Sequence, residues 1–305
     1  MDHLDHSVRL AAFRFLEEQT QFAGEDGALR RTILERGFTY EGDRVPLLGP
    51  QGIFKPRILA AIPLSITTVP VVEGESRPYD DAFGDDGLLR YRYRGTDPSH
   101  HENVGLRLAM QQQVPLIYFH GIVPGLYAPE WPVYIVGDDP ERLTFTVSVD
   151  ERAFASLGNV EVEQAAIRRR YVTRLFRQRL HQTAFRERVV RAYRHHCAVC
   201  SLKREELIEA AHIMPDADPL GEPAIPNGVA LCRLHHAAFD RYLIGIRPDC
   251  VVEVRQDVLD DSDGPMLIHG LQGFHGSPLV VPHRESWKPD RRLLEERYER
   301  FRQAG

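Results

Sequence analysis

The sequence predicts an α+β protein of more than one domain, and three observations support this. A chain of 305 residues is longer than a single hydrophobic core usually organises. Short β-branched and aromatic runs occupy the first half, and a stretch with helical periodicity follows them. The second half carries cysteines and histidines at metal-ligand spacing. We expect a helical arm (1–56), a curved β-sheet or barrel (57–160), a basic helical connector (161–195) and a zinc-stapled unit (196–305).

The first 56 residues predict two short helices. Apolar side chains recur at helical spacing over His6–Gln19, and Leu29–Arg36 shows a second, shorter pattern. Two helices in front of a sheet suit a DNA-binding arm of the winged-helix type. They suit equally an appendage that packs against the sheet, and the sequence leaves both interpretations open.

Residues 57–160 predict closely spaced strands. Five runs rich in β-branched and aromatic residues are separated by Gly, Pro and Asp. They are Ser65–Val72, Leu88–Arg94, Pro115–Ile122, Trp131–Gly137 and Leu143–Asp150. One predicted helix, Asn103–Gln112, interrupts them. Strands this close together favour a curved sheet or a small barrel.

Residues 161–195 predict one or two helices with a strongly basic surface. Between Arg168 and Arg194 the sequence has ten arginines and one acidic residue, Glu187, although the whole chain has a net charge of −6. Arginines on the outward face would contact DNA phosphates and give affinity without sequence preference. The alternative is a solvated helix whose arginines pair with acidic residues elsewhere. The expected backbone contacts are Arg168, Arg169, Arg170, Arg174 and Arg177.

Four residues of the last unit have the spacing of a closed structural zinc site. A C-x2-C pair is followed about thirty residues later by a C-x2-H pair, and each pair can hold one side of a tetrahedral ion. The expected zinc ligands are Cys197, Cys200, Cys232 and His235. Cys250 is the competitor for the fourth position. A zinc-binding module without catalysis is the alternative explanation of these four residues.

The same segment contains a second set of residues that the zinc site does not use: His212, Asn227, His236 and Asp240. Their order, with a C-x2-C in front and a cysteine before the last histidine, resembles the HNH (ββα-metal) nucleases. The resemblance implies a β-hairpin followed by a helix, with His212 as the general base and Asn227 holding its imidazole. His236 and Asp240 are four residues apart, so on a helix they share a face and can bind one divalent metal ion.

One position departs from that family. Many members have Asp or His directly before the general base as a further metal ligand, whereas this chain has Ala211. The metal would then be held by His236, Asp240, water and phosphate oxygens, with Glu209 as a further candidate. An imidazole–carboxylate pair accepts Mg²⁺, Mn²⁺, Ni²⁺ or Zn²⁺, so the sequence leaves the catalytic metal open.

The residues after Asp249 predict elements that brace the nuclease unit. We expect a strand over Val251–Gln256, a Gly-rich turn, a second strand over Pro278–Pro282 and a charged helix over Asp290–Gln303.

A second resemblance lies in the predicted sheet. Residues 79–95 read Tyr-Asp-Asp-Ala-Phe-Gly-Asp-Asp-Gly-Leu-Leu-Arg-Tyr-Arg-Tyr-Arg-Gly, which resembles the signature of SRA (SET- and RING-associated) domains. Such domains bind DNA with 5-methyl- or 5-hydroxymethylcytosine by flipping the base out of the duplex. The resemblance implies that Tyr79 and Tyr93 sandwich the base and that Asp81 accepts hydrogen bonds from its Watson–Crick edge. Arg94 stands where the family usually has Thr, which leaves the base preference open.

Together the two resemblances imply a bacterial, cytoplasmic, modification-dependent restriction endonuclease. Its partner would be double-stranded DNA with modified cytosine, and a homodimer would cut both strands. Two alternatives stay open: an HNH nuclease that reads a phosphorothioate backbone or plain sequence, and a modified-DNA-binding protein with a weak nuclease. No run approaches the length of a membrane span, and the N-terminus lacks the basic and apolar regions of a signal peptide.

Overall fold

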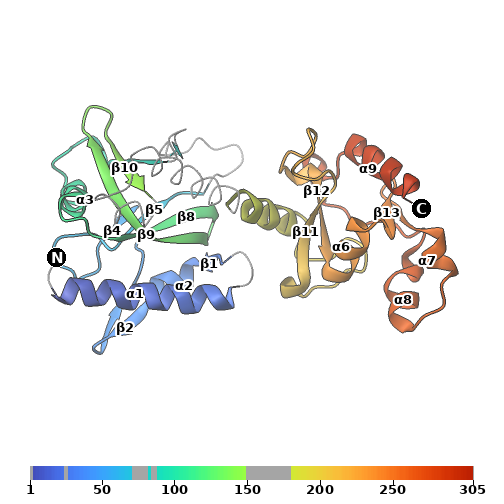
Figure 1. Cartoon of the computed structure of the whole chain (residues 1–305), viewed down its shortest axis with the longest axis horizontal. Coiled ribbons are helices and arrows are strands. Elements are labelled where there is room, and N and C mark those ends of the chain that lie inside the picture. Colours follow the sequence, from blue (N-terminus) through green and yellow to red (C-terminus); the bar gives the residue numbers. More distant parts are fainter. Residues whose placement is uncertain (1–2, 24–26, 71–81, 84–87, 149–179, 305) are drawn as a thin grey trace, which may run out of the picture. The chain divides into compact units, whose positions relative to one another are not determined.

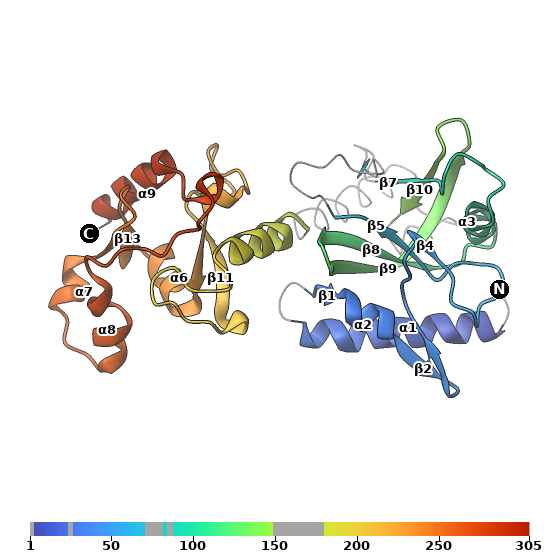
Figure 2. The ribbon, with the colours of Figure 1, turned by 180° about the vertical axis from the view of Figure 1, so that it is seen from behind.

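The computed structural model describes residues 3–23, 27–70, 82–83, 88–148 and 180–304. The chain divides into two compact units, Met1–Leu180 and His181–Gly305 (Figures 1 and 2). The helix over residues 180–192 begins at the boundary and otherwise belongs to the second unit, where its residues Phe185 and Val189 join the core together with Tyr193, which follows the helix. The sequence had placed this stretch in a separate connector.

A curled mixed sheet forms the first unit. Its strands, in spatial order, are β4 (Ile53–Phe54), β5 (Ser65–Thr68), β8 (Leu116–Val123), β9 (Leu126–Asp139), β10 (Thr144–Ser148), β7 (Leu89–Arg92) and β6 (Ala82–Phe83), and β1 (Leu29–Arg30) also pairs with β9. Only the β5–β8 pair is parallel. The register shifts along both long edges of β9, and such irregularities bend a sheet. The predicted curved sheet is confirmed by this arrangement.

The helices of the first unit are α1 (His3–Phe22), α2 (Arg31–Arg36) and α3 (His101–Gln111), and a separate hairpin joins β2 (Phe38–Tyr40) to β3 (Asp43–Val45). The apolar residues of α1 belong to one core cluster with residues of β8. Figure 1 shows α1 running along one side of the sheet. Arg9 of α1 is buried; it pairs with Asp5 at 2.5 Å and donates to the Pro63 carbonyl at 2.9 Å. The first 56 residues are thus integral to the sheet unit and are not a free arm. Leu29 and Arg30, expected to be helical, form β1 instead.

The second unit contains the ββα order that the sequence predicted. Its elements are η1 (Glu205–Leu207), β11 (Ile208–His212), η2 (Ile225–Asn227), β12 (Gly228–Cys232), α6 (Arg233–Asp240), β13 (Ile244–Ile246), β14 (Val252–Val254), α7 (Gln256–Asp260), α8 (Pro265–Gly270), η3 (Gln272–Phe274), η4 (Glu285–Trp287) and α9 (Arg291–Gln303). β11 and β12 form an antiparallel hairpin, β13 and β14 form a second, and α6 follows the first hairpin directly. The two hairpins, α6 and α9 share one hydrophobic core with the helix over residues 180–192.

Two expectations for the end of the chain differ from the structure. Pro278–Pro282 is not a strand, because only an isolated bridge joins Val251 to Pro278. The expected Gly-rich turn instead contains the short helices α7 and α8. The final helix α9 is confirmed, and the Asp290 carboxylate caps it by accepting from the Arg292 and Leu293 amides. The described helices include none with the length and hydrophobicity that a membrane span requires.

Candidate active site and metal centre

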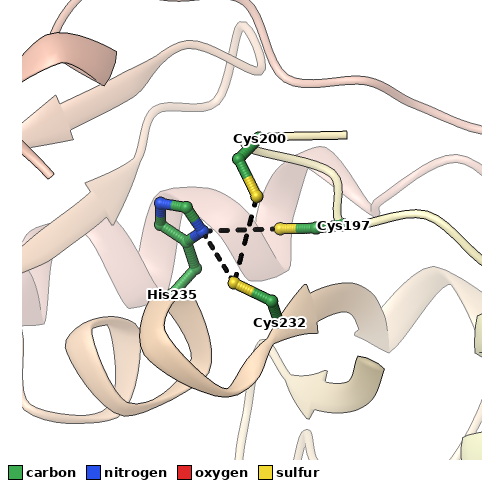
Figure 3. Close-up of side chains that lie close together, drawn as sticks. All are labelled: Cys197, Cys200, Cys232 and His235. Carbon is green, nitrogen blue, oxygen red and sulfur yellow. Dashed lines mark hydrogen bonds between the residues drawn. The ribbon is translucent and has the colours of Figure 1, made fainter. Parts of the chain in front are cut away.

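The four expected zinc ligands meet at one point of the second unit (Figure 3). Their candidate ligand atoms all lie within 4.8 Å of one another. The sulfur of Cys232 lies 3.1 Å from His235 Nδ1 and 3.9 Å from the sulfur of Cys200. Separations of this size suit four donors around one tetrahedral ion, because zinc–sulfur bonds measure about 2.3 Å.

The chemistry of this cluster also suits a bound cation. Hydrogen bonds from the Cys200 and Cys232 thiols lower the pKa of Cys197, which favours the thiolate form that binds metals. His235 Nε2 donates to the carbonyl of Gly270 at 2.8 Å, and Nδ1 faces the sulfurs. Cys250 is not part of the cluster. The cluster can therefore hold a metal ion with the four donors that the sequence predicted.

His212 is the last residue of β11, where it pairs with Gly228 of β12. Its imidazole stacks on the ring of Phe185, with centroids 3.9 Å apart and planes inclined by 11°. Its buried Nε2 atom has no hydrogen-bond partner among the described residues; the nearest carboxylate, that of Asp216, lies 3.9 Å away. Burial lowers the pKa of His212, so the neutral imidazole is favoured. A neutral imidazole with an unpaired nitrogen can accept a proton.

Asn227 does not hold the imidazole of His212, and that expectation is corrected. Its side-chain oxygen accepts from the Met214 amide at 2.8 Å, and its amide group donates to the carbonyls of Met214 and Glu222 at 3.0 Å. Its own carbonyl accepts from Ile213 at 2.9 Å. The side-chain amide of Asn227 is buried, so its donors and its acceptor need hydrogen-bond partners. Backbone groups of the loop that follows β11 supply them. Asn227 therefore fixes the strand end on which His212 sits.

His236 and Asp240 lie on one face of α6, as their four-residue spacing predicted. His236 Nε2 is 3.4 Å from an Asp240 carboxylate oxygen, so an imidazole nitrogen and a carboxylate can bind the same cation. Both residues act on the pKa of His212, in opposite directions. The fold thus brings the predicted base and the predicted metal ligands to one site. The donor set fits a divalent cation.

Glu209 contacts His236. One carboxylate oxygen lies 2.7 Å from His236 Nδ1, and the other lies 3.1 Å from Arg233 Nε. Because a proton on Nδ1 is needed for this bond, the contact directs the lone pair of His236 to Nε2, the side of Asp240. Ala211 is completely buried and offers no ligand. The sequence identified Glu209 as a candidate but did not reveal its partner.

Most residues of the expected DNA-contacting surfaces lie outside the described part of the chain. These are Tyr79 and Asp81 of the expected base pocket and Arg168, Arg169, Arg170, Arg174 and Arg177 of the basic stretch. Tyr93 is described, and it is 1% exposed. Its ring stacks on Phe145 at 4.5 Å, and its hydroxyl bonds to Asp138 and Arg107. This placement puts Tyr93 in the packed interior of the sheet unit and does not support a base-stacking role.

Two contacts at the candidate site were not predicted from the sequence. Phe185 belongs to the stretch that the sequence assigned to the basic connector, and its contact with His212 joins residues 27 positions apart. Arg297 of α9 donates to the Phe239 carbonyl at 3.1 Å and lies 3.9 Å from Asp240. No short spacing of residues in the sequence predicts either contact. The apolar periodicity of residues 180–192 is the signal that could have placed that helix in the core.

Comparison with known proteins supports the same domain. Residues 197–247 match the model of a family described as HNH endonuclease. A solved structure titled "Modification dependent TagI restriction endonuclease" aligns with 14% identity over 78% of this chain and 81% of that chain, at a TM-score of 0.29. The comparison with curated proteins found no match. The matched family segment spans both candidate metal-binding sets of residues, so residues 197–247 are similar to an HNH endonuclease domain and the protein is a nuclease.

Proposed function

We propose that the protein hydrolyses DNA phosphodiester bonds near a modified cytosine, with His212 as general base and a divalent cation on His236 and Asp240. The observation that carries this proposal is that a buried imidazole nitrogen without a hydrogen-bond partner among the described residues lies within electrostatic reach of an imidazole–carboxylate pair on one helix. A purely structural zinc module would need neither group. Their proximity favours hydrolysis over simple DNA binding.

The chain's own residues supply the proton transfer. His212 takes a proton from a water molecule as the water oxygen forms a bond to phosphorus. The bond from phosphorus to the 3′ oxygen breaks, and this oxygen receives a proton from solvent. A divalent cation at His236 and Asp240 would stabilise the charge that develops on the phosphate and on the departing oxygen. The depressed pKa of His212 keeps it neutral, and therefore able to act as a base, at neutral pH.

We assign the Cys197 cluster to a structural Zn²⁺ ion. Three thiols and one imidazole prefer zinc among the common divalent ions, whereas the imidazole–carboxylate pair accepts Mg²⁺, Mn²⁺ or Ni²⁺. The cluster joins the loop at Cys197 and Cys200 to α6, which also carries His236 and Asp240. Its proposed role is therefore to hold the catalytic helix.

The proposed base specificity rests on the resemblance of residues 79–95 to SRA domains. Tyr79 and Asp81 are the residues assigned to the flipped base, and Tyr93 contributes only as part of the signature because its ring is buried. The curled sheet of the first unit is compatible with such a domain. Phosphate contacts by Arg168 and its neighbours would add salt-sensitive affinity.

Cleavage of modified and unmodified plasmid tests the proposal. Supercoiled DNA with cytosine, 5-methylcytosine, 5-hydroxymethylcytosine or phosphorothioate linkages is incubated with the protein in Mg²⁺, Mn²⁺ or Ni²⁺. We expect cutting of the two modified-cytosine plasmids, and loss of at least about a hundredfold in rate for His212→Ala. Linear product is expected from a two-fold dimer, because one site cuts one strand.

Each other outcome identifies an alternative. Cutting of only phosphorothioate DNA, or equal cutting of all four plasmids, would reject the modified-cytosine pocket and keep the nuclease. Binding of modified DNA without cutting in any metal would identify a DNA-binding protein with an inactive nuclease. Near-normal cutting by His212→Ala would reject the assigned base.

A further inference from the structure

Among the described residues, His212 Nε2 has no hydrogen bond to hold the orientation of the imidazole, and the Asp216 carboxylate lies 3.9 Å away. The side chain of Asn227 is committed to Met214 and Glu222. A general base nevertheless needs one defined orientation, because a small misplacement of a reacting group lowers the rate strongly. The contact that the structure does provide is the ring of Phe185.

We propose that Phe185 is a positioning residue for the general base, whose ring holds the His212 imidazole in the orientation in which it accepts the proton of the attacking water. The two rings are nearly parallel, inclined by 11°, with centroids 3.9 Å apart. A flat ring against one face resists rotation of the imidazole, while the His212 side chain as a whole stays 23% exposed. This inference rests on the proposed role of His212.

The residue opposite His212 in the hairpin is a glycine, which leaves space for the Phe185 ring. Gly228 pairs with His212 across the hairpin, and a Cβ atom placed on it would lie 2.9 Å from Phe185 Cζ and 2.4 Å from Val189 Cγ2. Both distances are shorter than van der Waals contact. Glycine at 228 therefore allows the helix over residues 180–192 to lie against the hairpin and bring Phe185 onto His212.

Phe185 also helps to set the environment of the base. It is 2% exposed, and burial lowers the pKa of His212. The charged and titratable groups that act on this imidazole are Asp216 of the following loop and His236 and Asp240 of α6. Removing the ring would admit water to one face of the imidazole, which raises its pKa towards the ordinary value.

The test compares Phe185→Leu with Val189→Ala in the full-length protein. Both substitutions loosen the same helix against Gly228, but only the first removes the ring from His212. The measurements are kcat, KM and the pH–rate profile on 5-methylcytosine plasmid in Mn²⁺, with zinc content and circular dichroism as checks of folding. For Phe185→Leu we expect kcat to fall by about tenfold or more, with little change in KM. The acidic limb of its pH–rate profile should move to higher pH. The less buried imidazole of His212 has a higher pKa and is therefore already protonated at a higher pH.

The outcomes separate this inference from the proposed function. If His212→Ala abolishes cleavage while Phe185→Leu behaves like Val189→Ala in kcat and pH profile, Phe185 is only a core residue and the inference is wrong. If His212→Ala cuts normally, the proposed function itself fails. Phe185→Met, which fills the space with a flexible chain, gives the same comparison if the leucine variant does not fold.

Discussion

His235 and His236 are adjacent on α6 but belong to two different sites. His235 is 2% exposed, and both of its ring nitrogens are engaged, by the cysteine sulfurs and by the Gly270 carbonyl. The side chain of His236 is 24% exposed and lies between two carboxylates, Glu209 and Asp240. Consecutive helix residues point about 100° apart, so one short helix can serve both sites.

The difference between these histidines agrees with the roles proposed for the two sites. A structural metal site is closed by four protein donors, whereas a catalytic site keeps positions open for water and substrate. The Cys197 cluster offers four buried or half-buried donors, and the α6 pair offers two donors towards solvent. Substitutions at the first site should therefore act on folding, and those at the second on chemistry.

The largest effect is expected from loss of a cysteine ligand. Cys197→Ser should remove stoichiometric zinc and unfold the second unit, because metal binding in such sites is worth about 10 kcal/mol or more and is inseparable from folding. Zinc content and limited proteolysis measure the result. Cys250→Ser is the matched control, since its thiol lies outside the cluster. A folded, zinc-free Cys197→Ser protein would show that the hydrophobic core alone maintains this unit.

The next largest effect is expected at the open site. His236→Ala should still fold and bind zinc, but its cleavage rate should fall by more than about a hundredfold. This loss exceeds the usual effect of removing a residue that only hydrogen-bonds to a metal ligand. Higher Mn²⁺ concentration should restore part of the rate, because Asp240 still offers one ligand. His235→Ala should instead lose zinc. Identical behaviour of the two variants would mean that the two histidines do not serve separate sites.

The cluster of Cys197, Cys200, Cys232 and His235, and the proximity of His236 to Asp240, could be predicted from the sequence because short spacings determine them. The C-x2-C and C-x2-H pairs each lie within one loop or helix turn, and His236 and Asp240 share a helix face by periodicity alone. The contacts that hold these residues depend on how distant segments pack. The Phe185–His212 stack, the Glu209–His236 bond and the Asn227–Met214 bonds are of this kind, and the last of them replaced an expected bond to His212.

The first unit shows the same limit in its strands. β-branched runs located β5, β7, β8 and β10, but the periodicity did not reveal that Leu29 and Arg30 would add to β9. A two-residue strand has too little pattern of its own to be recognised. The burial of Arg9 could not be predicted from the sequence either, because the carbonyls of Pro63 and Pro115 that accept its hydrogen bonds come close to it only in the folded chain.

The smallest effect is expected at Glu209, and it refines the contrast between the two histidines. Both imidazoles are oriented by an acceptor on one nitrogen: a carbonyl for His235 and the Glu209 carboxylate for His236. Glu209→Gln keeps an oxygen acceptor for His236 Nδ1, whereas Glu209→Ala removes it. If Glu209 acts by orienting His236, the alanine variant should require about 10- to 100-fold more Mn²⁺ for half-maximal cleavage, and the glutamine variant only a few-fold more. Glu206→Gln, an exposed neighbour, should leave the metal requirement unchanged. Equal losses for Glu209→Gln and Glu209→Ala would show instead that the carboxylate charge itself binds the cation, so that Glu209 takes the place of the ligand that Ala211 does not supply.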